Sequence, residues 1–278
     1  MQKIYAMSDI HGMIRSLRER LSQLNVDEIR NGDARLLFLG DYIDRGYNSF
    51  KVLDTLFHLQ KDLGENVIVL KGNHDQWFLE FLYGQNPEWL GNLRATAFLS
   101  EFLTESELGN VNHLMARMKP DLTHGIVRKA MEERHKDLFL WMKSLPLYYE
   151  TDHQIYVHAG VDEDAEDLWQ VGTSDEMFLE KYPPQTGFFY KDIIAGHVST
   201  STASGNRELH DVYYDGLSHF YIDGVDSYLP SIRNGEFVIP LLRYTEERGI
   251  GNYDRIDQNG QPNLICTKDW NTLCTDHS

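Results

Sequence analysis

The sequence predicts an α/β fold, with a β-rich core flanked by helices and interrupted by a helical insert. Three observations predict it. Five short apolar runs each end in a polar cluster with glycine close by, which is typical of buried strands. Helical patterns separate the first three runs, and strand–helix–strand alternation indicates a parallel sheet covered by helices. A long segment in the middle of the chain has mainly helical patterns.

The strands and the helices between them can be placed in order. The expected strands are Lys3–Met7, Leu36–Leu39, Val67–Leu70, Ile155–Val157 and Asp192–Ala195. Residues 14–24 carry apolar side chains at spacings of three and four, which predicts a helix with one buried face. A second helix is expected to begin at Asn48 or Ser49, either of which can cap it.

The helical segment runs from Asp75 to about Arg134, with turn signals near Pro87 and Gly91. We expect residues 76–135 to form a helical insert within a domain that spans residues 1–245. Strand-like stretches return at residues 212–216, 219–224 and 237–244, and they either extend the sheet or form a second sheet that packs on it. Residues 246–278 are polar and weakly patterned, so we expect a C-terminal tail.

The composition excludes several classes of protein. Hydrophobic residues make up 41% of the chain and aromatic residues 12%, which is not a disordered composition. The apolar runs are far shorter than the ~20 residues of a membrane span. Two cysteines and no visible secretory signal favour the cytoplasm. The formal charge of −17 disfavours an extended nucleic acid or an anionic lipid as a partner, so an anionic substrate would need local positive charge, which metal ions supply.

The strand ends carry the residues suited to chemistry. Ligands of open α/β sheets bind at the carboxyl ends of the strands, so the polar residues there should converge. They are Asp9, His11, Asp41, Asp44, Arg45, Asn73, His74, His158 and His197. Turn preferences explain an Asp or Asn at one or two strand ends, but not such residues or histidine at all five.

This set favours metal ions. Asp, Asn and neutral His suit manganese, iron, zinc or cobalt, and the absence of cysteine from the set excludes a thiolate site. Converging carboxylates repel one another unless cations neutralise them. The set is larger than one ion needs, which favours two metals with a bridging carboxylate, an arrangement that activates water and clamps a phosphoryl group.

In this order, the motifs SDIHG, GDYIDRG, GNHD, HAG and GH resemble those of the metallophosphoesterases. The GDYIDRG form is similar to the phosphoprotein phosphatase branch, which includes calcineurin and the lambda-type bacterial enzymes. Each motif alone is weak, but five in order are highly specific. The resemblance covers about residues 1–245 and implies the αββα fold of that family, a two-sheet β-sandwich core flanked by helices.

The resemblance also implies a role for each strand-end residue. Two divalent ions are the implied cofactors, with manganese expected and iron, zinc, cobalt or nickel as alternatives. The implied ligands, from the first metal to the second, are Asp9, His11, the bridging Asp41, Asn73, His158 and His197. His74 would protonate the leaving group, Asp44 would orient His74, and Arg45 would bind two phosphate oxygens.

One position departs from the family pattern. Lambda-type enzymes usually carry a second arginine two positions after a tryptophan, between the two late histidines. Here Trp169 is followed by Val171 at that position, and no arginine lies between His158 and His197. The candidates to replace it are Lys181, Lys191, Arg94, Arg117 and Arg128. Alternatively, the substrate needs less binding at that point.

Three functions remain open. We favour a phosphatase that hydrolyses phosphate monoesters, above all phosphoserine and phosphothreonine of proteins, by attack of a metal-bound hydroxide. The first alternative is a symmetrical bis(5′-nucleosyl)-tetraphosphatase, whose substrate is a dinucleoside polyphosphate and whose bases would stack on Trp77, Trp89 or Trp169. The second is a metal-dependent binding protein with weak or no turnover, which the missing arginine motivates and the His74–Asp44 pair opposes.

The remaining polar candidates are expected to be structural. His113, His124 and His135 belong to the helical segment and are predicted to lie on the surface. His219 precedes a strand and is interpreted as structural. Asp75 continues the GNHD motif, where it either caps the following helix or supports a ligand histidine, and we favour the cap.

Overall fold

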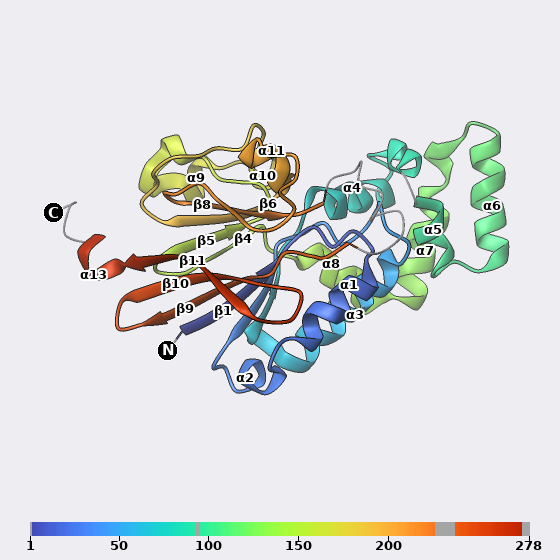
Figure 1. The fold of residues 1–278 in the computed structure, drawn as a ribbon. Coiled ribbons are helices and arrows are strands. Elements are labelled where there is room, and N and C mark those ends of the chain that lie inside the picture. The colour runs from blue at the N-terminus through green and yellow to red at the C-terminus, as the bar shows by residue number, and fades with distance from the viewer. Residues whose placement is uncertain (1, 93–94, 226–236, 274–278) are drawn as a thin grey trace.

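The computed structural model describes residues 2–92, 95–225 and 237–273. Two β-sheets face one another between helices, and further helices extend the molecule away from the two termini (Figure 1). One sheet has the strand order β11-β10-β9-β1-β2-β3 and the other β4-β5-β6-β8-β7. The predicted two-sheet α/β fold is therefore confirmed.

The first sheet consists of β1 (Gln2–Met7), β2 (Arg35–Phe38), β3 (Val67–Val69), β9 (Leu242–Glu247), β10 (Ile250–Ile256) and β11 (Pro262–Asp269). The second consists of β4 (Tyr148–Glu150), β5 (Gln154–Val157), β6 (Asp192–Ser199), β7 (Tyr213–Tyr214) and β8 (His219–Asp223). β1, β2 and β3 run parallel to one another, as do β5, β6 and β8. All five predicted strands are present, and their parallel pairing brings their carboxyl ends to one edge of each sheet.

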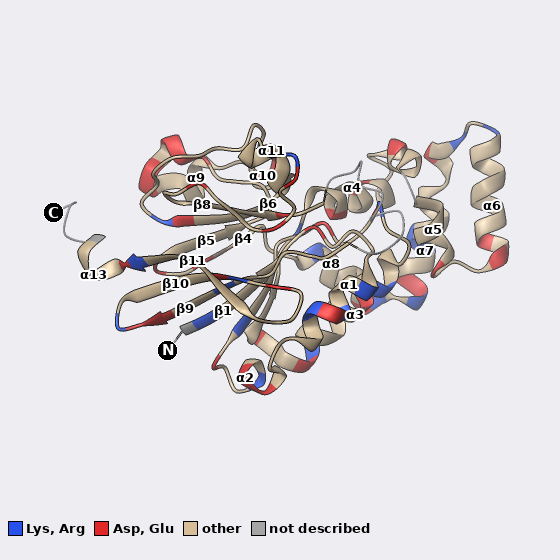
Figure 2. Cartoon of the chain, viewed as in Figure 1, with Lys and Arg blue, Asp and Glu red and all other residues tan. Residues whose placement is uncertain are grey.

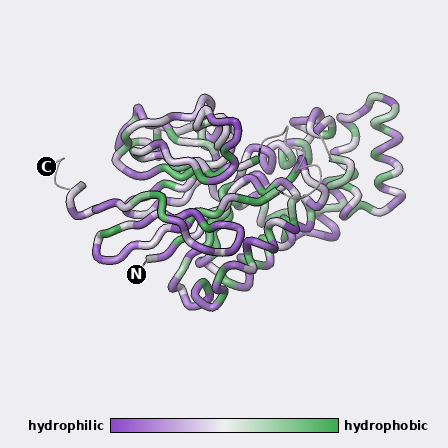
Figure 3. The backbone as a smooth tube through the Cα atoms, viewed as in Figure 1, coloured by the Kyte–Doolittle hydropathy of each residue, from purple (hydrophilic) through white to green (hydrophobic). Residues whose placement is uncertain are grey.

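The strands are apolar on both faces because each face is covered. In β1, Ile4 and Ala6 point into the layer between the sheets, whereas Tyr5 and Met7 pack under helices. The intersheet layer also receives Phe220 of β8. The hydropathy of the backbone follows this arrangement, with hydrophobic segments along the strands and hydrophilic segments on the outer loops (Figure 3). Burial on both sides explains why the strands read as continuous apolar runs.

The helices that flank the first sheet are α1 (Ile14–Ser22), α2 (Val26–Arg30) and α3 (Ser49–Leu63), and those near the second are α9 (Trp169–Gly172), α10 (Asp175–Glu180) and α11 (Thr200–Ser204). Leu17 of α1 and Leu53 of α3 pack on the outer face of the first sheet. Trp169 and Phe178 cover the second sheet. Residues 14–24 and the segment after Asn48 thus form the predicted amphipathic helices.

The segment between β3 and β4 contains α4 (Asn73–Leu82), α5 (Ala95–Ser100), α6 (Glu105–Ala116), α7 (His124–Arg134) and α8 (Lys136–Ser144), with a 3-10 turn, η2 (Pro87–Gly91). An aromatic cluster of Phe78, Phe81, Trp89 and Phe98 holds its first part together. Helix thus continues to Ser144, beyond the expected end of the insert at residue 135. None of the helices in the described ranges is long and apolar enough to cross a membrane.

Two expectations about the C-terminal part are wrong. Residues 246–273 are not a separate tail, because β10 and β11 extend the first sheet and are followed by α13 (Trp270–Leu273). The strand predicted over residues 237–244 begins only at Leu242. Pro240 has no N–H to offer a ladder, and the carbonyl of Ile239 accepts from Arg20 Nε at 2.6 Å instead of pairing in a sheet.

Candidate metal centre and active site

The nine strand-end residues meet where the two sheets face each other. Asp9 and His11 follow β1, Asp41 and Asp44 follow β2, and Asn73 begins α4 a short turn after β3. The remaining four are Arg45, His74, His158 and His197. Contacts between side chains or backbones connect eight of these residues, and Arg45 directly follows Asp44 in the same loop, so the structure brings the predicted site residues together.

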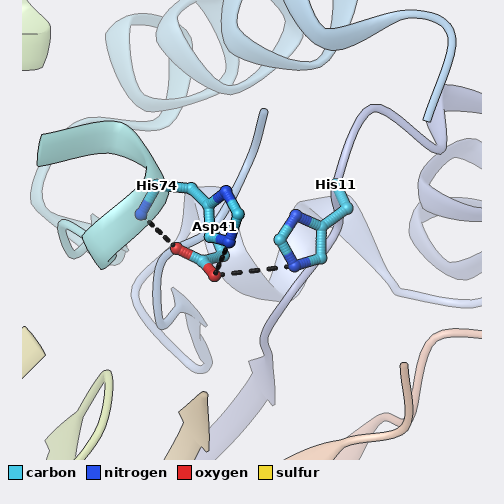
Figure 4. Close-up of side chains that lie close together, drawn as sticks. All are labelled: His11, Asp41 and His74. Carbon is cyan, nitrogen blue, oxygen red and sulfur yellow. Dashed lines mark hydrogen bonds and ion pairs between the residues drawn. The ribbon is translucent and has the colours of Figure 1, made fainter. Parts of the chain in front are cut away.

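Asp41 lies at the centre of the cluster. Its Oδ2 lies 3.5 Å from His11 Nε2 and 3.9 Å from His74 Nε2. Figure 4 shows this carboxylate between the two rings. Its Oδ1 lies 3.4 Å from His158 Nε2 and accepts the backbone N–H of His74 at 3.0 Å. Burial by itself would raise the pKa of Asp41, but His158, His74, His11 and Arg45 outweigh it and hold that pKa below its usual range. The carboxylate is therefore ionised and reaches histidines on both sides.

Asn73, His158 and His197 form the side of the cluster next to the second sheet. Asn73 Oδ1 lies 2.9 Å from His158 Nε2 and 3.2 Å from His197 Nδ1. Burial, followed by the charge of His158, lowers the pKa of His197 to about 4, which keeps this ring neutral at pH 7. A metal ligand must be deprotonated, so the low pKa suits His197 to that role.

The donor atoms fit divalent ions. His11 is fully buried, its Nδ1 donates to the carbonyl of Ile43 at 2.7 Å, and its Nε2 has no hydrogen-bond partner within the described chain. This orphaned nitrogen faces Asp9 Oδ1 at 3.8 Å and Asp41 Oδ2 at 3.5 Å. Two groups have ligand atoms within 4.8 Å of one another: His11, Asp41 and His74, and Asp9, Asp41 and His158. Because Asp41 belongs to both, the cluster suits two ions that share one carboxylate.

His74 differs from the other histidines in its partner. Its Nδ1 contacts Asp44 Oδ2 at 2.6 Å, so the ring presents only Nε2 to the cluster. Burial lowers the pKa of His74, but the carboxylates of Asp41 and Asp44 outweigh this and raise it above the usual value. The ring therefore carries a proton more readily than His11 or His197. This arrangement suits proton donation, although Nε2 is also placed where it could bind an ion.

The backbone at the cluster is strained. Nine non-glycine residues in the described ranges have positive φ, and six of them belong to the site: Asp9, His11, Asp41, Asp44, Arg45 and His197. Such conformations cost free energy and persist where function requires them. The glycines of the motifs allow the strand ends to approach, since a Cβ on Gly72 would lie 2.3 Å from the Asp41 carboxylate.

Asp75 fixes the backbone on which the central ligand Asp41 lies. Its carboxylate accepts three buried backbone N–H groups, from Gly72 at 3.0 Å, Asp41 at 2.9 Å and Tyr42 at 3.1 Å. The bond from Gly72 caps α4, as predicted, and the other two fix the backbone of the central ligand. Burial raises the pKa of Asp75 to about 7, and the charge of Asp41 adds to this effect.

We expect Asp75→Ala to destabilise the protein, because three buried donors lose their acceptor. An unpaired buried donor costs about 1–3 kcal/mol, so the free energy of unfolding in urea should fall by at least ~2 kcal/mol. Asp27→Ala is a suitable control, since Asp27 also lies in a first helical turn but its side chain is 81% exposed. Equal losses in the two variants would contradict the role given to Asp75.

The four candidates for the missing second arginine that the structure describes make no contact with the nine site residues. Lys181 Nζ is bound by Glu163 at 2.9 Å and by the carbonyl of Val161, and Lys191 Nζ by Glu150 at 2.7 Å. Trp169 is buried under the second sheet. Of the three insert arginines, Arg128 pairs with Glu132, Arg117 ends α6, the outermost helix in Figure 1, and Arg94 lies outside the described residues. The structure therefore does not support these four as replacements, and Arg94 stays a prediction.

Sequence reasoning missed two residues of the site. Asn92 Nδ2 donates to Asp44 Oδ2 at 3.0 Å, a contact that the local sequence does not predict. Asp223 is buried at the end of β8, and burial raises its pKa well above the usual range, with the charge of Asp9 adding to the effect. A signal for Asp223 was present, because it follows an apolar strand and precedes a glycine like the other strand-end acids.

The other histidines are structural or lie on the surface. His219 is buried between Glu163 at 3.1 Å and Asp215 at 3.2 Å, which confirms the structural interpretation. His113 is exposed, as expected of the helical segment, whereas His124 and His135 are half-buried. The ring of His135 packs 4.7 Å from that of Phe50, so this histidine joins α3 to the insert.

Two facing sheets with Asp, Asn and His at their strand ends define the metallophosphoesterase class of protein. The chain belongs to the calcineurin-like phosphoesterase family, whose family model matches residues 2–215. The relationship predicted from the five motifs is therefore confirmed.

Individual relatives match shorter segments. A PP2A-like serine/threonine-protein phosphatase, PPG1, of Candida albicans is 32% identical over 102 residues, which are 37% of this chain and 24% of that protein. A symmetrical bis(5′-nucleosyl)-tetraphosphatase of Coxiella burnetii is 40% identical over 84 residues, 30% of this chain and 26% of that protein. The chain thus spans about a quarter of the length of these curated relatives. Among solved structures, a cold-active protein tyrosine phosphatase of a Shewanella species has a TM-score of 0.56 at 16% identity, covering 96% of this chain and 81% of its own, a likeness of fold.

Proposed function

We propose that this protein hydrolyses phosphate monoesters, with phosphoserine and phosphothreonine of proteins as the favoured substrates, at a site that binds two divalent ions. The observation that carries the proposal is the buried Asp41 carboxylate, which reaches His11 on one side and His158 on the other. Asp9 and His11 would hold one ion and Asn73, His158 and His197 the other, with manganese as the expected metal. When bound, the ions supply an activated water and neutralise charge on the phosphoryl group.

The residues of the chain would perform the remaining tasks. Arg45 is half-buried and directly follows Asp44, and its charge lowers the pKa values of His11 and Asp41. Its guanidinium would hold two phosphate oxygens. His74 Nε2 would deliver a proton to the leaving oxygen while Nδ1 remains on Asp44. This pair also argues against a pure binding protein, because binding alone needs no proton donor.

The surroundings favour a phosphoprotein over a dinucleoside polyphosphate. Trp89 and Trp169 are each only 1% exposed, so neither can stack on a base. Acidic side chains of η4 (Glu163–Leu168) lie on the outer side of the second sheet in Figure 2. Closer to the site, Glu180 of α10 accepts from Nε1 of Trp77, whose ring lies beside that of His74, at 2.9 Å. A substrate with four phosphates would be repelled there more strongly than a single phosphoryl group. The low cysteine content supports the predicted cytoplasmic setting.

The tetraphosphatase remains the second candidate, and two observations favour it. A symmetrical bis(5′-nucleosyl)-tetraphosphatase of Coxiella burnetii is 40% identical to this chain over 84 residues. In addition, the half-buried Trp77 lies beside the proposed proton donor, with its ring centroid 4.7 Å from that of His74. One base could therefore stack next to the reacting phosphate.

A side-by-side assay with added manganese tests the choice. We expect phosphate release from phosphoserine and phosphothreonine peptides to exceed ADP release from diadenosine tetraphosphate by at least ~10-fold in kcat/KM, which corresponds to about 1.4 kcal/mol of transition-state preference. The reverse ratio would identify the tetraphosphatase. Metal binding without turnover of either substrate would leave the binding protein.

A further inference from the structure

We propose that Asn92, a residue of the helical insert, is a positioning residue for the His74–Asp44 pair. The inference rests on the proposed function, in which His74 donates a proton to the leaving group. Asn92 Nδ2 donates to Asp44 Oδ2 at 3.0 Å, and His74 Nδ1 contacts the same oxygen at 2.6 Å. The insert thereby reaches the proton donor through a single carboxylate.

Asp44 depends on this contact for its orientation. Its side chain is buried, its backbone has a φ of 65°, and its other oxygen, Oδ1, has no hydrogen-bond partner within the described ranges. The described side-chain bonds of Asp44 are thus those to His74 and Asn92. Without Asn92, His74, which Asp44 is meant to orient, would be the only described residue whose side chain bonds this carboxylate.

Asn92 is itself held by the insert. It follows η2, where its backbone N–H bonds the carbonyl of Trp89 at 2.9 Å and its carbonyl accepts from Ala95 at 3.2 Å. The buried Trp89 ring packs against Phe78 and Phe81 of α4, with ring centroids 4.8 and 5.0 Å apart.

These contacts form a chain that begins and ends at His74. His74 starts on α4, α4 packs on Trp89, Trp89 precedes Asn92, and Asn92 returns to Asp44 and His74. The aromatic core of the insert therefore sets where the amide of Asn92 lies, and the amide sets the carboxylate. Partners of this kind, which orient a group without touching the substrate, typically contribute about 10–100-fold to activity.

The test uses two aryl phosphates that differ in their need for a proton donor. Phenolate is a poor leaving group and requires protonation, whereas 2,4-dinitrophenolate leaves without it. Asn92→Leu keeps the size of the side chain and removes the donor. We expect its kcat to fall about 10-fold with phenyl phosphate and less than about 2-fold with 2,4-dinitrophenyl phosphate, with KM and manganese content unchanged.

Two controls make the result specific. Asn112→Leu changes an exposed asparagine on α6 and should leave both rates unchanged. In an Asp44→Asn background, Asn92→Leu should have little further effect, because the two residues act as one unit.

Several outcomes would overturn the inference. An equal loss with both esters would show that Asn92 supports only the local structure, and an unchanged rate with phenyl phosphate would show that it has no role. The same loss in the wild-type and Asp44→Asn backgrounds would separate Asn92 from the pair. A wild-type protein that hydrolyses neither ester would remove the proposed function and this inference together, whereas the other outcomes remove the inference alone.

Discussion

Replacing Asp41 with Asn is expected to abolish hydrolysis and to lower the metal content of the protein. The substitution keeps the shape of the side chain and removes the charge that His11 and His158 share from opposite sides, at 3.5 and 3.4 Å. Enzymes of this kind accelerate hydrolysis at least ~10⁶-fold, so loss of the shared ligand should reduce kcat/KM by ~10³-fold or more. Phosphate release and elemental analysis of the purified protein measure the two effects.

A control must separate loss of the metal from loss of a buried carboxylate in general. Asp192→Asn serves this purpose, because Asp192 is buried at the opposite end of β6 and pairs with Lys268 at 3.1 Å. We expect that variant to lose stability and to keep its manganese and its turnover. If Asp41→Asn kept both metal ions, or if metal-free protein were fully active, Asp41 would not be a bridging ligand.

The sheets could be predicted because their strands are apolar on both faces, whereas the edge of the first sheet could not. β11 is mostly exposed or half-buried, so its sequence lacks the apolar run that marks β1 or β2. The turns around β10 did carry a signal, since Gly249 and Gly260 adopt positive φ between antiparallel strands. The low hydrophobicity of this C-terminal segment led to the prediction of a tail, although the two glycines indicated turns between strands.

The site could be predicted to the extent that it is local in sequence. Asp9, Asp41 and Asn73 each lie within four residues of the end of a strand, and parallel strands place such residues at one edge without further information. Asn92 is different, because its position depends on how Trp89 packs against α4, which no local pattern encodes. The same reason explains why Lys181 was a wrong candidate for the second phosphate-binding residue. Its ion pair with Glu163 arises from the packing of loops, which the spacing of residues in the sequence does not reveal.

Replacing His74 with Asn is expected to lower kcat about 10²–10⁴-fold, the usual contribution of a general acid, while both metal ions stay bound. The reason is that the two ring nitrogens of His74 have different partners. Nδ1 is occupied by Asp44 at 2.6 Å, and only Nε2, 3.9 Å from Asp41 Oδ2, faces the cluster. The loss should be greatest for alkyl and phenyl phosphates, whose leaving groups need a proton.

Metal content decides between the two roles that the geometry allows His74. The possible ligand atoms of His11, Asp41 and His74 lie within 4.8 Å of one another, so His74 could also bind an ion. If His74→Asn lost one of the two ions, His74 would be identified as a metal ligand. His153→Asn provides a control, since His153 is also a partly buried histidine but stacks on Trp270, with ring centroids 4.3 Å apart. Equal activity of His74→Asn and wild type would exclude His74 as the acid. A large loss of kcat with two ions retained leaves proton transfer as the task of this ring, with Asp44 and Asn92 to hold it.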